Sequence, residues 1–297
     1  MEFFPYGKAT CIGSLPHKSA DEALRIIDKF LLDIPIWPQL PNIDFHENMY
    51  IQYSEGMPGA VIDNTNEKIY FNSSHNLIND IEKTYEAYIS QNLEYFKISE
   101  TFSKGLYSFV NFYKNKKTNI IKGHVLGPIS FGLTVTDQDK KSIFYNEELR
   151  DAVIKSLVMK TKWQIQFLKQ ISDNIIIFID EPYLASFGSA YINLTKEQVI
   201  EYLNEVIDAI HEEGAISGIH CCGNTDWSIL MDTKIDILNF DAFGFAKNIL
   251  IYPDKIKQFF SRGGILAWGI VPTSDEIENT TPEMLLTILE KYFDELI

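Results

Sequence analysis

The sequence has few cysteines and no excess of positive charge. Its 297 residues include three cysteines, Cys11, Cys221 and Cys222, which are too few and too poorly spaced for a disulfide framework, so we interpret them as thiols. Twenty-six Lys and Arg residues stand against 41 Asp and Glu residues, a formal net charge of −15. Because this charge repels phosphate backbones and anionic membrane surfaces, we expect no nucleic acid and no membrane among the partners.

The sequence also lacks export and membrane signals. No uninterrupted apolar run reaches the roughly 18 residues of a membrane span, and no basic segment followed by an apolar run opens the chain. We therefore expect a cytoplasmic protein. No linker rich in Pro, Gly or Ser divides the chain, and 45% hydrophobic with 23% charged residues is typical of a folded protein. We expect residues 1–297 to form a single domain.

From about residue 119 the chain repeats a short apolar run and then an amphipathic stretch, the pattern of βα units around a parallel sheet. Each run is rich in Ile, Val or Leu at consecutive positions, as in strands covered on both faces. The expected strands are 119–126, 175–180, 215–221, 235–239 and 264–270. Residues 146–172 place apolar side chains at three- and four-residue steps and predict a helix.

The first third is less regular. Residues 9–12 and 34–37 are expected strands, and residues 56–72 have the alternation of a hairpin. Three helix starts are also predicted: Ser19 with Glu22, Thr195 with Gln198 as a capping box, and Thr281 before Pro282.

This count gives seven strands, two before residue 40 and five after residue 119. The length suits a (β/α)₈ TIM barrel of about 250 residues with an insertion, the hairpin near residues 56–72. We therefore predict an α/β barrel whose eighth strand is missing or lies beyond the chain end. A doubly wound open sheet is the alternative, but the turn at residues 12–16 lacks the G-x-G-x-x-G pattern of that class.

Barrel enzymes carry their chemistry at the carboxyl ends of the strands. The strand at 215–221 leads into His220-Cys221-Cys222, where alternation points His220 and Cys222 to one side and Cys221 to the other. A histidine nitrogen and a thiolate so placed can bind one Zn²⁺ ion. The alternative is that the cysteine is a small apolar core residue.

Acidic residues follow two further strands. Asp241 follows the next strand and is either an oxygen ligand of the metal or the N-cap of a helix. Asp180 and Glu181 end the strand at 175–180, and because adjacent residues face opposite ways only one of them should enter the pocket. Such a carboxylate suits the ammonium group of a substrate, and a salt bridge to a neighbouring helix is the alternative.

Four motifs carry a family resemblance: Ile12-Gly13-Ser14, Gly127-Pro128-Ile129-Ser130, Ile179-Asp180-Glu181-Pro182 and His220-x-Cys222. In that order and at those intervals, the chain resembles the C-terminal catalytic barrel of cobalamin-independent methionine synthase over nearly its whole length. Residues 37–41, 47–50 and 268–272 look closer to a short, stand-alone branch of that superfamily. The superfamily also contains uroporphyrinogen decarboxylase and zinc methyltransferases that take a methyl group from a corrinoid protein.

The resemblance implies a zinc-dependent transfer of a methyl group to a small thiol such as homocysteine. Zinc in such a site lowers the pKa of the substrate thiol. His220 and Cys222 match the family's His-x-Cys ligand pair, and Asp241 lies where the family usually has Glu. The family's second cysteine ligand, on the eighth strand, has no counterpart in this chain. Ser14 matches a residue that binds the amino-acid part of the thiol, and Asp180 or Glu181 matches the acid that receives its ammonium group.

The methyl donor is left open between a methylcorrinoid protein, a folate and a small methylated compound, although the acidic charge argues against a polyglutamate tail. Two other functions compete. One is a decarboxylase similar to that for uroporphyrinogen, which binds its tetra-acid substrate through basic residues. The other is a non-catalytic binding subunit that partners a corrinoid protein.

Overall fold

The structure is a computed structural model that describes residues 3–73, 77–116, 118–189 and 192–296. Its centre is a five-stranded sheet in which every strand is parallel to its neighbours and the spatial order follows the chain. The strands are β3 (Ile121–Leu126), β4 (Ile175–Asp180), β5 (Ile216–Cys221), β6 (Ile237–Phe240) and β7 (Ile265–Trp268). The predicted α/β class and these five strands are confirmed, with ends that differ by up to two residues.

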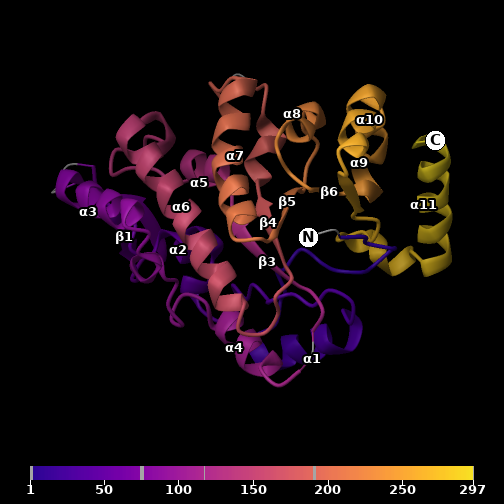
Figure 1. Ribbon diagram of the computed structural model, residues 1–297, viewed down its shortest axis with the longest axis horizontal. Coiled ribbons are helices and arrows are strands. Elements are labelled where there is room, and N and C mark those ends of the chain that lie inside the picture. The colour runs from indigo at the N-terminus through magenta and orange to yellow at the C-terminus, as the bar shows by residue number, and fades with distance from the viewer. Residues whose placement is uncertain (1–2, 74–76, 117, 190–191, 297) are drawn as a thin grey trace.

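Helices surround this sheet and follow its strands in βα order (Figure 1). In chain order they are α1 (Ala20–Phe30), α2 (Met49–Ser54), α3 (Leu77–Ile89), α4 (Lys104–Tyr113), α5 (Pro128–Thr134), α6 (Glu147–Leu168), α7 (Lys196–Glu212), α8 (Trp227–Asp232), α9 (Ala242–Ile249), α10 (Pro253–Ser261) and α11 (Pro282–Leu296). The helix predicted over residues 146–172 is α6, so that prediction is confirmed.

The predicted strands at residues 9–12 and 34–37 do not form regular strands. Instead, isolated parallel bridges join Ile36 to Lys122 of β3 and Ser14 to Gln39. Pro35 and Pro38 explain the irregularity, because a proline has no N–H to donate to a ladder. The two segments still continue the parallel pairing outward from β3.

The hairpin predicted near residues 56–72 is confirmed. Strands β1 (Ala60–Asp63) and β2 (Lys68–Phe71) pair antiparallel, with Asp63 opposite Lys68. The Asp63 carboxylate accepts the backbone N–H groups of Thr65 and Asn66 at 3.0 Å, which closes the turn.

The three predicted helix starts are also confirmed. Ser19 accepts the N–H of Glu22 at the start of α1, and Thr281 accepts the N–H of Met284 at the start of α11. Thr195 and Gln198 form both hydrogen bonds of a capping box at the start of α7.

Two apolar layers cover the sheet. The larger layer packs the sheet against the helices, and a smaller one lies on the opposite face, where isoleucines from successive strands meet Phe178. On that second face Gly218 leaves room for the Phe178 ring, since a Cβ at Gly218 would lie 2.3 Å from it. Phe3 of the N-terminal segment packs against this smaller layer. The polar side chains described below occupy the same face, toward the carboxyl ends of the strands.

Within the described residues, β7 is followed by α11 and not by an eighth parallel strand. Trp268 of β7 contacts the rings of Tyr292 and Phe293 on α11. Figure 1 shows α11 at the end of the molecule opposite α3. None of the helices in the described segments has the length and apolar character needed to cross a membrane.

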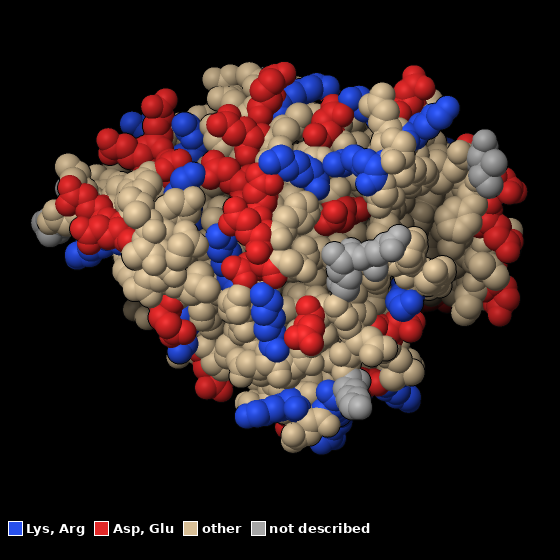
Figure 2. All heavy atoms as spheres, viewed as in Figure 1, with Lys and Arg blue, Asp and Glu red and all other residues tan. Residues whose placement is uncertain are grey.

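The negative charge is distributed over the surface. Figure 2 shows acidic and basic side chains interspersed on one face, with a band of acidic residues over α7. Part of this charge is paired between helices, since Lys155 and Lys162 of α6 bind Glu205 and Glu212 of α7. Such partly exposed pairs contribute little to stability.

We expect Thr195→Ala to lower the free energy of unfolding by about 1 kcal/mol, because it removes the cap of α7. Thr65→Ala is the matched control, since that exposed hydroxyl makes no hydrogen bond among the described residues. Urea denaturation of both variants measures the difference. Equal stability of the two variants would contradict the capping argument.

Candidate functional site

Three polar residues lie side by side at the carboxyl ends of β4, β5 and β6. In the parallel register Asp180 is paired with His220, and His220 with Asn239. Residues paired in register point to the same face of a sheet, and neighbouring strands lie about 4.8 Å apart. The three side chains therefore form one polar row above the apolar layer that contains Phe178.

Asn239 orients His220. The Asn239 amide nitrogen donates to the carbonyl of Ala267 at 2.9 Å, which directs the amide oxygen toward His220. His220 Nδ1 lies 2.6 Å from that oxygen and is therefore the donor nitrogen. Burial lowers the pKa of His220 to about 4, so the ring is neutral at pH 7. Nε2 then carries a lone pair, and no hydrogen bond reaches it from the described residues.

Cys222 and Asp241 follow the row, each two residues beyond a member of it. Partial burial of the sulfur, and then the charges of Asp180 and Asp241, raise the pKa of the Cys222 thiol. The Asp241 charge also acts on His220. Cys221, by contrast, is fully buried in the larger apolar layer. The charge of Asp241 thus acts on both His220 and Cys222, while Cys221 points into the core.

Asp241 is the N-cap of α9. Its Oδ1 accepts the N–H of Gly244 at 3.0 Å. The predicted alternative, that Asp241 caps a helix, is therefore confirmed. Since a cap engages one carboxylate oxygen, the role as a metal ligand stays a prediction that depends on Oδ2.

Asp180 shares the interior with a buried lysine. Lys122 of β3 is fully buried, donates to the carbonyl of Ile12 at 2.6 Å and lies 4.4 Å from the centre of the Phe178 ring. Burial raises the pKa of Asp180 and lowers that of Lys122, and the opposite charge of each partner resists both shifts. Asp180 Oδ1 has no hydrogen-bond partner among the described residues. A buried, unpaired carboxylate oxygen marks Asp180 as a group that can accept a donor from a ligand.

Glu181 faces away from this row. Its carboxylate accepts the N–H groups of Ile129 and Ser130 and the Ser130 hydroxyl, at 3.0, 2.7 and 2.6 Å. A Cβ at Gly127 would lie 2.1 Å from Glu181 Oε1, so the glycine is required where the carboxylate approaches the start of α5. The Gly-Pro and Asp-Glu-Pro motifs thus form one hydrogen-bonded unit. These three hydrogen bonds engage both carboxylate oxygens of Glu181. Asp180 is therefore the remaining candidate of the two for binding the substrate ammonium group.

On the same face of β3 as Lys122, His124 is held in a buried network. Its Nε2 lies 2.9 Å from Gln39 Oε1, and its ring stacks on Trp37 with 3.7 Å between centroids. Burial, with the charge of Lys122, holds the pKa of His124 well below its usual range. Ser14, predicted to bind substrate, is exposed on the segment bridged to Gln39. No contact between Ser14 and the polar row occurs among the described residues.

Sequence reasoning missed Asn239 and Lys122. In the sequence Asn239 is only the last residue of an expected strand. Its hydrogen bond to His220 follows from the register of β5 and β6. Lys122 had a signal, since it is the charged residue in the otherwise apolar run 120–126 and shares its alternation with His124. A buried lysine in a central strand requires an acid or carbonyl partner.

His220 and Cys222 are suitable metal ligands, but a complete set of protein ligands is not assembled around them in the described residues. Considering the described ranges alone, no group of three or more His, Cys, Asp or Glu side chains is placed to hold a metal ion. His220 Nε2 and the Cys222 thiol are nevertheless donors of the kind that Zn²⁺ prefers. No family model and no curated protein matches the sequence, so the family resemblance stays a prediction.

The burial of Glu181 predicts a pH dependence of stability. Burial raises its pKa from 4.5 to about 7 against the three hydrogen bonds. Between these values the folded chain holds a proton that the unfolded chain has lost, so the free energy of unfolding falls as the pH rises. The slope is up to about 1.4 kcal/mol per pH unit. We expect Glu181→Gln, which does not titrate, to show a shallower fall.

Urea denaturation at several pH values between 4.5 and 7 measures the slope for both proteins. The comparison uses slopes because the substitution also lowers stability by replacing an acceptor with an amide. The pKa values of Asp180 and Glu47 are also raised. Both residues are present in the two proteins, so their contributions cancel when the slopes are compared. Identical slopes would show that Glu181 is ionised throughout this range.

Proposed function

We propose that this chain is a zinc-dependent methyltransferase that transfers a methyl group to a small thiol such as homocysteine. The observation that carries the proposal is the orientation of His220 by Asn239, which leaves Nε2 as an acceptor without a hydrogen-bond partner among the described residues. Histidines that bind metals typically donate their other ring N–H to an oxygen in this way. A histidine kept neutral is in the protonation state that ligation requires.

Three residues would act as zinc ligands. His220 and Cys222 would hold the ion, with Oδ2 of Asp241 as an oxygen ligand. A zinc ion so bound would lower the pKa of the substrate thiol, so that the nucleophilic thiolate persists at neutral pH. Cys222 must itself lose a proton to become a ligand, which makes zinc binding stronger at higher pH. Ligand positions not used by the protein remain for the substrate sulfur.

Asp180 would bind the ammonium group of the thiol substrate. Its unpaired Oδ1 is a buried acceptor in register with His220, so a ligand that reaches both spans one strand spacing. The buried Lys122 keeps the region from becoming strongly negative when no substrate is present. Ser14 remains a proposed contact for the amino-acid part.

The proposal includes a (β/α)₈ barrel. The five parallel strands follow one another in chain order, and isolated bridges add residues 36 and 14 in parallel beyond β3. This order supports an arrangement of seven successive strands of such a barrel. The decarboxylase alternative requires basic residues for a tetra-acid substrate, and the polar row supplies one acid, a histidine and an amide, with one buried lysine, Lys122, near Asp180. The observed charges therefore favour the methyltransferase, and a non-catalytic binding subunit is the result if zinc and thiol both fail to bind.

We expect the purified protein to bind zinc in near-stoichiometric amount. Cys222→Ser should lose about tenfold or more in zinc affinity, because it removes a thiolate ligand. Cys221→Ser is the matched control, since that sulfur is buried in the core. Metal analysis after dialysis against known zinc concentrations measures both, and equal retention by the two variants would remove the metal assignment.

We expect Asp180→Asn to weaken homocysteine binding by about tenfold to a hundredfold, since it removes the acceptor for the ammonium group. Binding of 4-mercaptobutanoate, which lacks the amino group, should change little. Calorimetry on the zinc-loaded protein with both thiols measures the difference. An equal loss for both thiols would show that Asp180 acts on the fold of the site and not on the ammonium group.

A further inference from the structure

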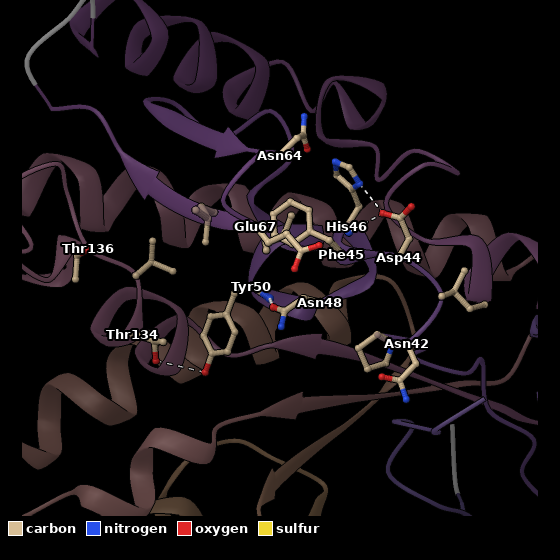
Figure 3. Close-up of a pocket in the computed structure, with 15 residues that line it drawn as sticks. Asn42, Asp44, Phe45, His46, Asn48, Tyr50, Asn64, Glu67, Thr134 and Thr136 are labelled. Atoms are coloured by element: carbon tan, nitrogen blue, oxygen red, sulfur yellow. Dashed lines mark hydrogen bonds and ion pairs between the residues drawn. The ribbon is translucent and has the colours of Figure 1, made fainter. Parts of the chain in front are cut away.

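A cavity of about 900 Å³ opens where α2, the β1–β2 hairpin and the end of α5 meet. Three segments line it: the loop and helix at residues 41–51, the turn of the β1–β2 hairpin with Ile69 of β2, and residues 134–136 at the end of α5. Figure 3 shows the side chains of Phe45, Tyr50 and Glu67 in the middle of this lining. Nothing in the proposed chemistry at His220 and Cys222 uses these residues.

Tyr50 connects the cavity to the candidate site. Its hydroxyl accepts a hydrogen bond from the Thr134 hydroxyl at 3.3 Å at the cavity wall (Figure 3). Burial, and then the charges of Glu181 and Cys222, raise the pKa of the same hydroxyl. Tyr50 also packs on α5, with its ring 6.5 Å from that of Phe131, and Glu181 binds the first turn of the same helix.

The cavity lining includes two acids and the rings of a phenylalanine and a tyrosine among amide, hydroxyl and aliphatic side chains. Asp44 and Glu67 contribute carboxylates, and no Lys or Arg is among the lining residues. Lys104, outside the lining, is 3.7 Å from Asp44 and offsets one of these charges, and His46 donates to the same Asp44 carboxylate at 2.7 Å. The Glu67 carboxylate makes no ion pair within the described ranges. The rings of Phe45 and Tyr50 offer faces that attract a cation.

We propose that this cavity binds the methyl donor and that the donor is an onium cation, a sulfonium or quaternary ammonium compound. The inference rests on the proposed methyltransferase function. An onium methyl group needs no hydrogen bond and is stabilised by carboxylates and aromatic faces, which the cavity supplies. The net charge of −15 favours the approach of a cation over that of a polyanion.

The transfer balances without a further reactant. The thiol first loses its proton to water. The thiolate sulfur then donates an electron pair to the methyl carbon and forms the new S–C bond. The bond from that carbon to the onium sulfur or nitrogen breaks, and its electron pair stays on the leaving atom. An anion and a cation thus give two neutral centres, a thioether and a sulfide or tertiary amine.

The binding test compares choline with 3,3-dimethylbutan-1-ol, which has the same shape without the charge. Calorimetry should show choline bound about tenfold or more tightly, as expected for a cation held by carboxylates and aromatic faces. Phe45→Leu and Glu67→Gln should each weaken choline binding by about fivefold to tenfold. Glu82→Gln, the same change on exposed α3 outside the cavity, is the matched control and should have no effect. Equal binding of the two compounds, or of choline to all variants, overturns the proposal.

The transfer test uses trimethylsulfonium as donor and homocysteine as acceptor, with methylcobalamin and a methylated folate in parallel. Product from trimethylsulfonium that falls in Phe45→Leu supports the proposal. Product from methylcobalamin or the folate alone overturns it while the methyltransferase function stands. No product from any donor, together with no zinc bound, removes the function itself. Cys222→Ala should bind choline like the wild-type chain, so that loss of transfer in that variant is separated from loss of donor binding.

Discussion

The parallel register of β4, β5 and β6 is the constraint on which the candidate site depends. It pairs Asp180 with His220 and His220 with Asn239, so that residues about 20 to 40 positions apart in the chain become neighbours. A shift of one residue in any of these strands would turn its polar side chain to the opposite face. The apolar layer beneath, around Phe178 and Gly218, holds that register by packing.

Several polar groups that enter this interior have a hydrogen-bond partner from another strand or helix. Asn239 is fixed by Ala267 and in turn fixes His220, while Glu181 is bound by the start of α5. Lys122 donates to Ile12. Because a buried polar group without a partner costs free energy, these bonds determine which atoms remain for a ligand. Among the described residues, Asp180 Oδ1 and His220 Nε2 make no hydrogen bond and remain for a ligand.

The two acids of the Asp-Glu-Pro motif therefore have different functions. Glu181 joins β4 to the helix that follows β3, and so it holds the loops around the site in place. Asp180 lies on the face of the sheet that carries Phe178, where the charge of the buried Lys122 acts on it. The end of the helix that Glu181 binds, at Thr134, lines the cavity that contains Tyr50.

Local chemistry made much of the fold predictable. Runs of Ile and Val specified β3 to β7, and Ser19, Thr195 and Thr281 specified helix starts, because strand propensity and capping act over a few residues. The candidate pair His220 and Cys222 could also be found from alternation alone. Residues 9–12 and 34–37 were predicted as regular strands but form only isolated bridges nearby. The apolar pattern does not show that Pro35 and Pro38 lack N–H groups for a ladder. The roles of Asn239, Glu181 and Lys122 were decided only by the tertiary structure, because each depends on a partner from a different strand or helix.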